Sequence, residues 1–316
     1  MKTKNIIVIS GATATGKTDL SLKVAQQFSG EIINCDSLQF YKELNIGTAK
    51  PSTDELNACT HHMINCASIT NPINAAQYVK QALPIIEEIH KKNQIAIIVG
   101  GSGFYLQALL EGMYPADDPD PEIIKKSEDL YQREGIDPFI KILKDIDPPS
   151  FERLHPNDHY RIRRAVEYYW ITGISFSKGA QTLKDKKQNQ SKNSNDWNIF
   201  HCYLEIPKDL HWEIMKKRTE KMIEKGLVEE VKDLLKQGFT GKEKPMQSIG
   251  YKEALAYLNG LIPTQDDLIE KIYIATRRLA KSQKTWFKSK RNKTKYNPLI
   301  DQTTILNDLN IFLKNE

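Results

Sequence analysis

The strongest constraint on the fold is the segment 11–18, which reads Gly-Ala-Thr-Ala-Thr-Gly-Lys-Thr directly after the apolar run Asn5–Ser10. This is the pattern of a phosphate-binding loop between a strand and a helix. Its glycines let the backbone turn tightly, so that its amides and the N-terminus of the next helix point at an anion. Lys17 adds a positive charge, and the Thr18 hydroxyl can hold Mg²⁺. The pattern predicts a phosphate site but does not say which phosphate is bound.

Short runs rich in Ile and Val alternate with helical patterns, which predicts a buried parallel sheet of the α/β class. The predicted strands are 5–10, 31–35, 95–99 and 198–206. The predicted helices are 18–28, 74–92 with a kink at Pro84, 103–111, 122–134, 138–144, 159–170, 209–225, 228–237, 252–258 and 265–288.

A cluster of Pro and Asp at 115–121 breaks this alternation and marks a predicted domain boundary. The chain then reads as helical to about Gly173, and the polar, low-complexity segment 178–195 is predicted to be a mobile loop. We therefore expect a core formed by 1–115 and 197–316, with a helical insertion at 116–196.

Composition limits the compartment and the partners. Of the 316 residues 40% are hydrophobic, but no apolar run approaches the roughly 20 residues of a membrane span. The N-terminus leaves no room for a signal peptide, and the four cysteines lack a paired spacing, so we expect a cytoplasmic protein without a membrane partner. The net charge is +5, yet 271–300 alone holds ten basic residues and no acidic one, which indicates a polyanionic partner.

Polar residues follow two further predicted strands. The second strand leads into Asp36, Ser37 and Gln39, and the third into Gly100-Gly101-Ser102-Gly103. Ligands of a parallel sheet bind beyond the carboxyl ends of its strands, so Asp36 should lie within reach of whatever the phosphate loop binds. Asp36 could coordinate Mg²⁺, bind a sugar, act as a base, or simply form a turn. Glycines stand where a nucleotide-hydrolysing protein would carry a magnesium-orienting Asp, which favours a pocket for a second reactant.

Two predicted helices carry cations beside aromatic rings, as nucleic-acid-binding surfaces often do. In 159–170 the face expected to be buried carries Ile162, Val166 and Tyr169. A second face carries Arg161, Arg164 and Tyr168. A solvated face with an Arg163–Glu167 ion pair is the alternative. In 265–288 a basic stripe is formed by Arg277, Lys281, Lys284 and Lys288, with Trp286 and Phe287 within it. A solvated face is again the alternative, although the absence of acids favours a polyanion.

Taken in order, six stretches resemble the tRNA dimethylallyltransferases (tRNA isopentenyltransferases) of bacterial type. They are 11–18, Asp-Ser-Leu-Gln at 36–39 with 45–51, 99–105, 155–167, 249–253 and 276–287. The resemblance covers nearly the whole chain. It implies a P-loop NTPase-like parallel-sheet core with an inserted helical tRNA-binding domain.

The resemblance also implies a reaction. A dimethylallyl group moves from dimethylallyl diphosphate to the exocyclic amine of the adenosine that is 3′-adjacent to the anticodon, in tRNAs reading codons that begin with U. The partners would be the tRNA anticodon stem-loop and the diphosphate, with Mg²⁺ as cofactor, and we expect a monomer.

The residue roles implied by this resemblance fall into four sets. The catalytic set is Asp36 as base, Ser102, Lys17 and Arg218. The diphosphate-binding set is Gly11, Ala12, Thr13, Ala14, Thr15, Gly16, Lys17 and Thr18. The tRNA-binding set is Asp36, Ser37, Leu38, Gln39, Ser102, Tyr160, Arg161, Ile162, Arg163, Arg164, Gly250, Tyr251, Arg277, Lys281 and Lys284. The metal-binding set is Thr18.

The sequence departs from the family pattern at Ala12, Thr15, Tyr160, Ile214 and Ser282. The last three affect the expected RNA-binding shell and one expected diphosphate contact more than the proposed base. Three other functions remain open: an adenylate isopentenyltransferase acting on free AMP or ATP, a nucleotide kinase, and an RNA-binding protein with a vestigial loop. The helical insertion and the acid-free basic helix disfavour the first. The missing strand-end Asp disfavours the second, and the intact loop disfavours the third.

Overall fold

The computed structural model describes residues 4–112, 120–189, 197–289 and 292–314. The chain divides into two compact units. The first unit joins Met1–Leu109 to Asp196–Glu316, and the second is Leu110–Asn195. The second unit thus begins at Leu110, a few residues before the insertion expected at 116–196.

The first unit is built on a six-stranded parallel sheet with the strand order β3-β2-β4-β1-β5-β6. The strands are β1 (Lys4–Gly11), β2 (Gly30–Asn34), β3 (His61–His62), β4 (Ile95–Gly100), β5 (Trp197–Leu204) and β6 (Thr294–Tyr296). Strand β1 lies between β4 and β5, and its register with β5 runs from Lys4–Trp197 to Gly11–Leu204. A parallel sheet among helices confirms the predicted α/β class.

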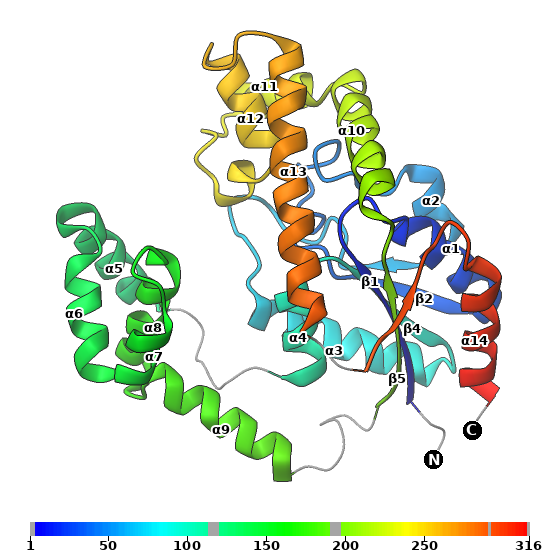
Figure 1. Ribbon diagram of the computed structural model, residues 1–316, viewed down its shortest axis with the longest axis horizontal. Coiled ribbons are helices and arrows are strands. Elements are labelled where there is room, and N and C mark those ends of the chain that lie inside the picture. The colour runs from blue at the N-terminus through cyan, green and yellow to red at the C-terminus, as the bar shows by residue number, and fades with distance from the viewer. Residues whose placement is uncertain (1–3, 113–119, 190–196, 290–291, 315–316) are drawn as a thin grey trace. The chain divides into compact units, whose positions relative to one another are not determined.

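Helices cover both faces of this sheet. Every residue from Asn5 to Gly11 in β1 is buried, which explains its continuous apolar sequence. The side chains of Ile7 and Ile9 belong to one apolar cluster with those of α1 (Lys17–Phe28) and α14 (Gln302–Lys314), and Figure 1 shows both helices beside the sheet. Right-handed crossovers place α3 (Ala75–Lys91), which leads into β4, on the opposite face.

The remaining helices of the first unit are α2 (Thr53–Ala58), α4 (Gly103–Glu111), α10 (Lys208–Glu224), α11 (Leu227–Lys236), a 3₁₀ turn (Lys244–Gln247), α12 (Tyr251–Leu258) and α13 (Gln265–Lys288). All of them except α2 and α4 contribute buried residues to a second apolar cluster. Leu227, Tyr251 and Ile272 from α11, α12 and α13 are buried together in this cluster, which also receives Leu44 from the chain after β2. Helices α10 and α13 run side by side above the sheet (Figure 1).

The second unit is helical. It contains α5 (Pro121–Glu134), α6 (Asp137–Ile146), α7 (Pro148–Arg153), α8 (His159–Thr172) and α9 (Phe176–Asn189). Its core is formed by Phe139, Leu143, Ile162, Ala165 and Val166. Aspartates begin three of the helices: the side chains of Asp120, Asp147 and Asp158 accept amide N–H groups in the first turns of α5, α7 and α8.

The loop predicted over 178–195 is wrong for its first part, because α9 extends to Asn189. Low hydrophobicity suggested a loop, but the Lys, Gln, Ala and Leu residues of this segment are good helix formers. The start of the helix is also fixed. The Asp147 carboxylate accepts the Ser177 N–H at 2.9 Å, and the Phe176 ring packs edge-on against Tyr168. Residues 190–195 lie outside the described part of the chain.

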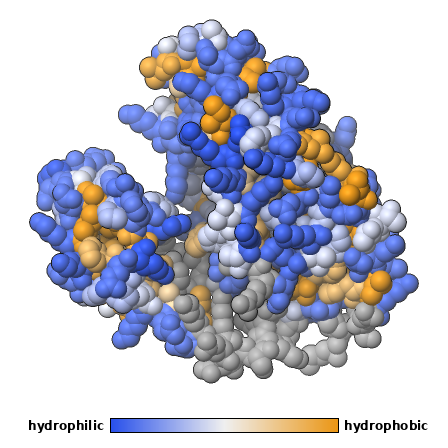
Figure 2. Space-filling model, viewed as in Figure 1, coloured by the Kyte–Doolittle hydropathy of each residue, from blue (hydrophilic) through white to orange (hydrophobic). Residues whose placement is uncertain are grey.

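The short elements α2, β3, α7 and β6 and the helix α14 were not predicted. Pro84 lies inside α3, which continues to Lys91. Most of the breaker cluster at 115–121 lies outside the described residues. On the face shown in Figure 2 hydrophilic side chains dominate and apolar ones form separate patches. Within the described segments, no helix combines the length and the apolar character needed to cross a bilayer.

Candidate active site

The phosphate loop has the concave backbone that anion binding requires. Strand β1 ends at Gly11 and α1 begins at Lys17, so residues 12–16 form the turn. Ala14 (φ 61°) and Gly16 (φ 76°) are left-handed, and alternating left- and right-handed residues turn successive N–H groups toward one point. Gly11 is required by packing, because a Cβ there would lie 2.7 Å from the Leu204 carbonyl oxygen. The loop is thereby fitted against β5.

Lys17 is folded into this loop. Its Nζ donates to the Ala12 oxygen at 2.7 Å and to the Gly11 oxygen at 3.2 Å. Burial lowers the pKa of Lys17 to about 8, an effect that the charge of Asp36 opposes and that of Arg218 reinforces. Burial also lowers the pKa of Arg218, and Asp36 again opposes the shift. The charges of Lys17, Arg218 and Asp36 therefore act on one another, while the roles expected for these residues stay predictions.

Asp36 and Ser102 lie on neighbouring turns, because β2 and β4 are paired in the sheet. The Asp36 Oδ1 atom accepts the Leu38 N–H at 3.1 Å. The Ser102 Oγ atom accepts the Ser37 N–H at 3.0 Å and lies 3.2 Å from the Ser37 Oγ atom. Gly100 permits this approach, since a Cβ there would lie 2.1 Å from the Cys35 carbonyl oxygen.

Thr13, at the tip of the phosphate loop, is held by two helices that are distant in sequence. Its carbonyl oxygen is bonded to His211 Nε2 (2.8 Å), its hydroxyl accepts from Arg218 Nη1 (3.0 Å), and its N–H donates to Gln283 Oε1 (2.9 Å). The Nε2 atom of Gln283 also donates to the Gly101 oxygen at 3.0 Å. Sequence reasoning missed His211 and Gln283. Gln283 stands within one of the six family stretches, which was a signal, whereas His211 had none.

Hydrogen bonds hold the loop at 45–49, which contacts segment 36–39. The Gln39 Nε2 atom donates to the Thr48 and Ala49 oxygens, both at 3.3 Å. The Glu230 carboxylate accepts the Ile46 N–H at 2.9 Å, and the Tyr251 hydroxyl donates to the same carboxylate. Tyr251 is fully buried, so its expected contact with tRNA is wrong for the side chain, which instead supports this loop. Gly250, just before it, is the N-cap of α12.

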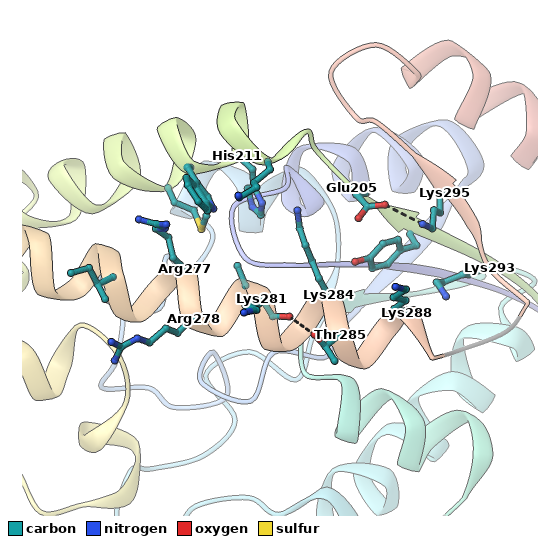
Figure 3. Close-up of a pocket in the computed structure, with 16 residues that line it drawn as sticks. Glu205, His211, Arg277, Arg278, Lys281, Lys284, Thr285, Lys288, Lys293 and Lys295 are labelled. Carbon is teal, nitrogen blue, oxygen red and sulfur yellow. Dashed lines mark hydrogen bonds and ion pairs between the residues drawn. The ribbon is translucent and has the colours of Figure 1, made fainter.

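The predicted basic stripe of α13 forms one wall of a cavity of about 840 Å³ (Figure 3). The other walls come from α10 and from the segment around β5 and β6. Eight basic residues line it: Lys208, Arg277, Arg278, Lys281, Lys284, Lys288, Lys293 and Lys295. Among the described residues of this wall Glu205 alone is acidic, and it pairs with Lys295 at 3.3 Å. We call this cavity the basic pocket. His211 lines it and also bonds Thr13, so the pocket adjoins the phosphate loop.

The residues of α8 that were expected to bind tRNA differ in their exposure and in their partners. Tyr160 and Arg161 are exposed, with Arg161 paired to Asp158 at 3.1 Å. The guanidinium of Arg163 lies 4.5 Å from the centre of the Tyr131 ring and is bonded to Glu128, so it is committed within the second unit.

Arg164 is exposed and is bonded to the buried Glu167 at 2.6 Å, so its contact with tRNA stays a prediction. Other side chains of α8 correct the expectation. Ile162 is buried, so its side chain cannot contact RNA. Tyr168, expected on the binding face, is buried and Tyr169, expected in the core, is only half-buried. Tyr168 is covered because α9 packs against it: the Phe176 ring lies edge-on to the Tyr168 ring, and a Cβ at Gly179 would lie 2.4 Å from the Tyr168 hydroxyl.

Comparisons with known proteins agree on one family. The sequence model described as IPP transferase matches residues 39–290. The chain is 38% identical over 285 residues to the tRNA dimethylallyltransferase of Caldanaerobacter subterraneus subsp. tengcongensis, covering 90% of this chain and 89% of that protein. It is 38% identical to the tRNA dimethylallyltransferase of Dictyoglomus turgidum, covering 90% and 84%.

Solved structures agree. The chain is similar to a tRNA isopentenylpyrophosphate transferase of Staphylococcus epidermidis, with a TM-score of 0.70, 31% identity and full coverage of both chains. It is also similar to a eukaryotic dimethylallyltransferase acting on tRNA, with a TM-score of 0.78 and 28% identity over 98% of this chain and 78% of that one. The resemblance found from the six stretches is thus confirmed, and the chain belongs to the IPP transferase family.

Proposed function

We propose that this protein is a tRNA dimethylallyltransferase. It transfers the dimethylallyl group of dimethylallyl diphosphate to the exocyclic amine of the adenosine 3′-adjacent to the anticodon, in tRNAs reading codons that begin with U. The observation that carries the proposal is the mutual effect of the Lys17, Arg218 and Asp36 charges at a phosphate loop that Arg218 contacts and that adjoins a basic pocket. The names of the relatives support it.

The leaving group would be held by the phosphate loop. The amides of residues 14–18 and the cations of Lys17 and Arg218 surround the concavity. As the bond between the allylic carbon and oxygen breaks, negative charge collects on the diphosphate, and fixed donors stabilise charge where it develops. The Ser102 hydroxyl, on the neighbouring turn, is proposed to contact the bridging oxygen.

The acceptor would be activated by Asp36. An adenine amine is a weak nucleophile because its lone pair is delocalised into the ring. As its nitrogen bonds the allylic carbon, one amine proton passes to the Asp36 carboxylate and the bonding electrons leave with the diphosphate. A positioned base of this kind contributes about 10²–10⁴-fold. The nearby Ser37, Leu38 and Gln39 are proposed to hold the base once it has flipped out of its stack.

A divalent cation, which we take to be Mg²⁺, fits this donor set. Within the described segments no cluster of three or more His, Cys, Asp or Glu side chains could cage a metal. Mg²⁺ needs no such cage, since it is commonly held by phosphate oxygens, waters and one or two protein oxygens. Thr18, in the first turn of α1, would supply its hydroxyl. When bound, the cation would neutralise charge on the diphosphate.

The tRNA would be held electrostatically. Arg277, Lys281 and Lys284 lie on one side of α13 and line the basic pocket. In the second unit, the exposed Tyr160 and Arg161 remain candidates for contact with the anticodon stem-loop. We propose that the protein acts as a cytoplasmic monomer.

The test is a transfer assay with radiolabelled dimethylallyl diphosphate and Mg²⁺. Label should enter unmodified tRNA, and not a matched tRNA whose target adenosine is replaced by guanosine, which has a carbonyl in place of the amine. Label in AMP alone would establish the adenylate isopentenyltransferase instead. Phosphate transfer from ATP without label in either acceptor would establish a nucleotide kinase.

A further inference from the structure

The most heavily bonded residue of the phosphate loop is Thr13, and its bonds join elements far apart in sequence. Its N–H, its hydroxyl and its carbonyl oxygen each contact a side chain of α10 or α13. The N–H of Thr13 is therefore committed to Gln283 and does not join the amides that face an anion. The concavity that remains begins at Ala14, where the backbone becomes left-handed.

Gln283 also reaches the turn that carries Ser102. Its Oε1 atom accepts from Thr13 at 2.9 Å, while its Nε2 atom donates to the Gly101 oxygen at 3.0 Å. One side-chain amide thus links the loop proposed to hold the diphosphate to the turn proposed to meet the bridging oxygen. An amide can do this because it donates and accepts at once.

The chain leaves room for this amide. A Cβ at Gly101 would lie 2.6 Å from Gln283 Nε2, which is closer than packed atoms approach. The backbone of Gly101 is not left-handed, so alanine is conformationally acceptable there. The Gln283 amide would be the nearest neighbour of the added Cβ, and the Gly11 oxygen, at 3.2 Å, would have to give way by only a few tenths of an ångström. The Gln283 amide is therefore the main obstacle to a side chain at position 101.

We propose that Gln283 is a positioning residue that fixes the phosphate loop relative to the Ser102 turn, and so aligns the leaving diphosphate with the reacting carbon. This inference rests on the proposed function. Gln283 touches no reacting atom; it acts through Thr13 and Gly101. Misplacement of reacting groups by about 1 Å can cost about 10²-fold in rate. We therefore expect loss of the amide to lower kcat and to leave tRNA binding nearly unchanged.

The experiment compares Gln283→Met with the full-length wild type. Methionine keeps the length of the side chain and removes both hydrogen bonds. We expect kcat for transfer to tRNA to fall about tenfold to a hundredfold, with the KM for tRNA within about twofold. Glu270→Met places the same residue at an exposed position of the same helix and should leave both constants unchanged. A wild-type kcat in Gln283→Met would overturn the proposal.

A second variant tests the same contact from the other side. Gly101→Ala should displace the Gln283 amide and lower kcat to a similar extent. The double variant should then be no slower than the slower single variant, because both changes break one link. Multiplicative losses would overturn the proposal, as would a loss confined to the KM for tRNA. If wild type itself transfers no label, the proposed function fails. Binding of inorganic diphosphate then tests Gln283 directly, since Gln283→Met should weaken it severalfold and equal affinity would overturn the proposal.

Discussion

The pKa of Lys17 makes a prediction that can be worked out in detail. Burial lowers it to about 8, whereas an unperturbed lysine titrates near pH 10.4. Only the protonated ammonium attracts a diphosphate. Lys17 is then about 90% protonated at pH 7 and about 10% at pH 9. Affinity for dimethylallyl diphosphate should be level below pH 8 and fall about tenfold per pH unit above it, because protonation must precede binding.

The assay is calorimetric titration with dimethylallyl diphosphate and Mg²⁺, without tRNA, from pH 6.5 to 9.5. Lys17→Arg is the matched control, because a guanidinium stays protonated over this range. The ligand's own ionisation is the same in both titrations and cancels in their ratio. That ratio should turn downward near pH 8. A ratio that is constant to pH 9.5 would show that Lys17 titrates normally and would refute the reasoning.

Three further predictions concern the proposed base, the supporting loop and the basic pocket. Asp36→Asn should lower single-turnover transfer by about 10²–10⁴-fold while tRNA affinity in a filter-binding assay stays within about twofold; near-normal transfer would remove Asp36 as the base. Gly47→Ala should destabilise the protein by about 1–3 kcal/mol in urea unfolding, since its Cβ would lie 2.4 Å from Tyr251 Cε2, and an unchanged midpoint would contradict the packing. Replacing Lys281 and Lys284 by Gln should reduce the slope of log affinity for tRNA against log salt by about 0.7 per lysine. An unchanged slope would mean that neither lysine neutralises a phosphate.

Local patterns were enough to predict the frame of the site. The phosphate loop follows a strand and precedes a helix, as its glycines and apolar flanks required. Parallel strands end at one edge, so Asp36 was expected beside the phosphate loop, and the structure adds that Ser102 lies on the neighbouring turn. The roles of these residues stay predictions. Family resemblance supplied what pattern alone could not, namely the expectation that the phosphate loop holds a leaving group.

The rest depended on contacts that no local pattern records. Gln283 reaches Thr13 across 270 positions of the chain, and nothing near either residue in sequence indicates the pair. Tyr251 looks like an RNA-contacting residue until the structure shows its ring against Gly47 and its hydroxyl on Glu230. Helix α9 was missed because the polar composition of 178–195 indicated a mobile loop, although many of its residues favour a helix.

The pairing of β1 with β5 has a consequence for how the protein is made. Gly11 is synthesised early, but Leu204, against which it packs, is synthesised nearly two hundred residues later. Gln283, which bonds Thr13 of the phosphate loop, is synthesised later still. Contacts between such distant segments form late in folding. In a nascent chain the phosphate-loop motif is therefore present long before the segments that complete the phosphate site have been synthesised. The contacts that hold the phosphate loop are therefore complete only when α13 has been synthesised and has packed against it.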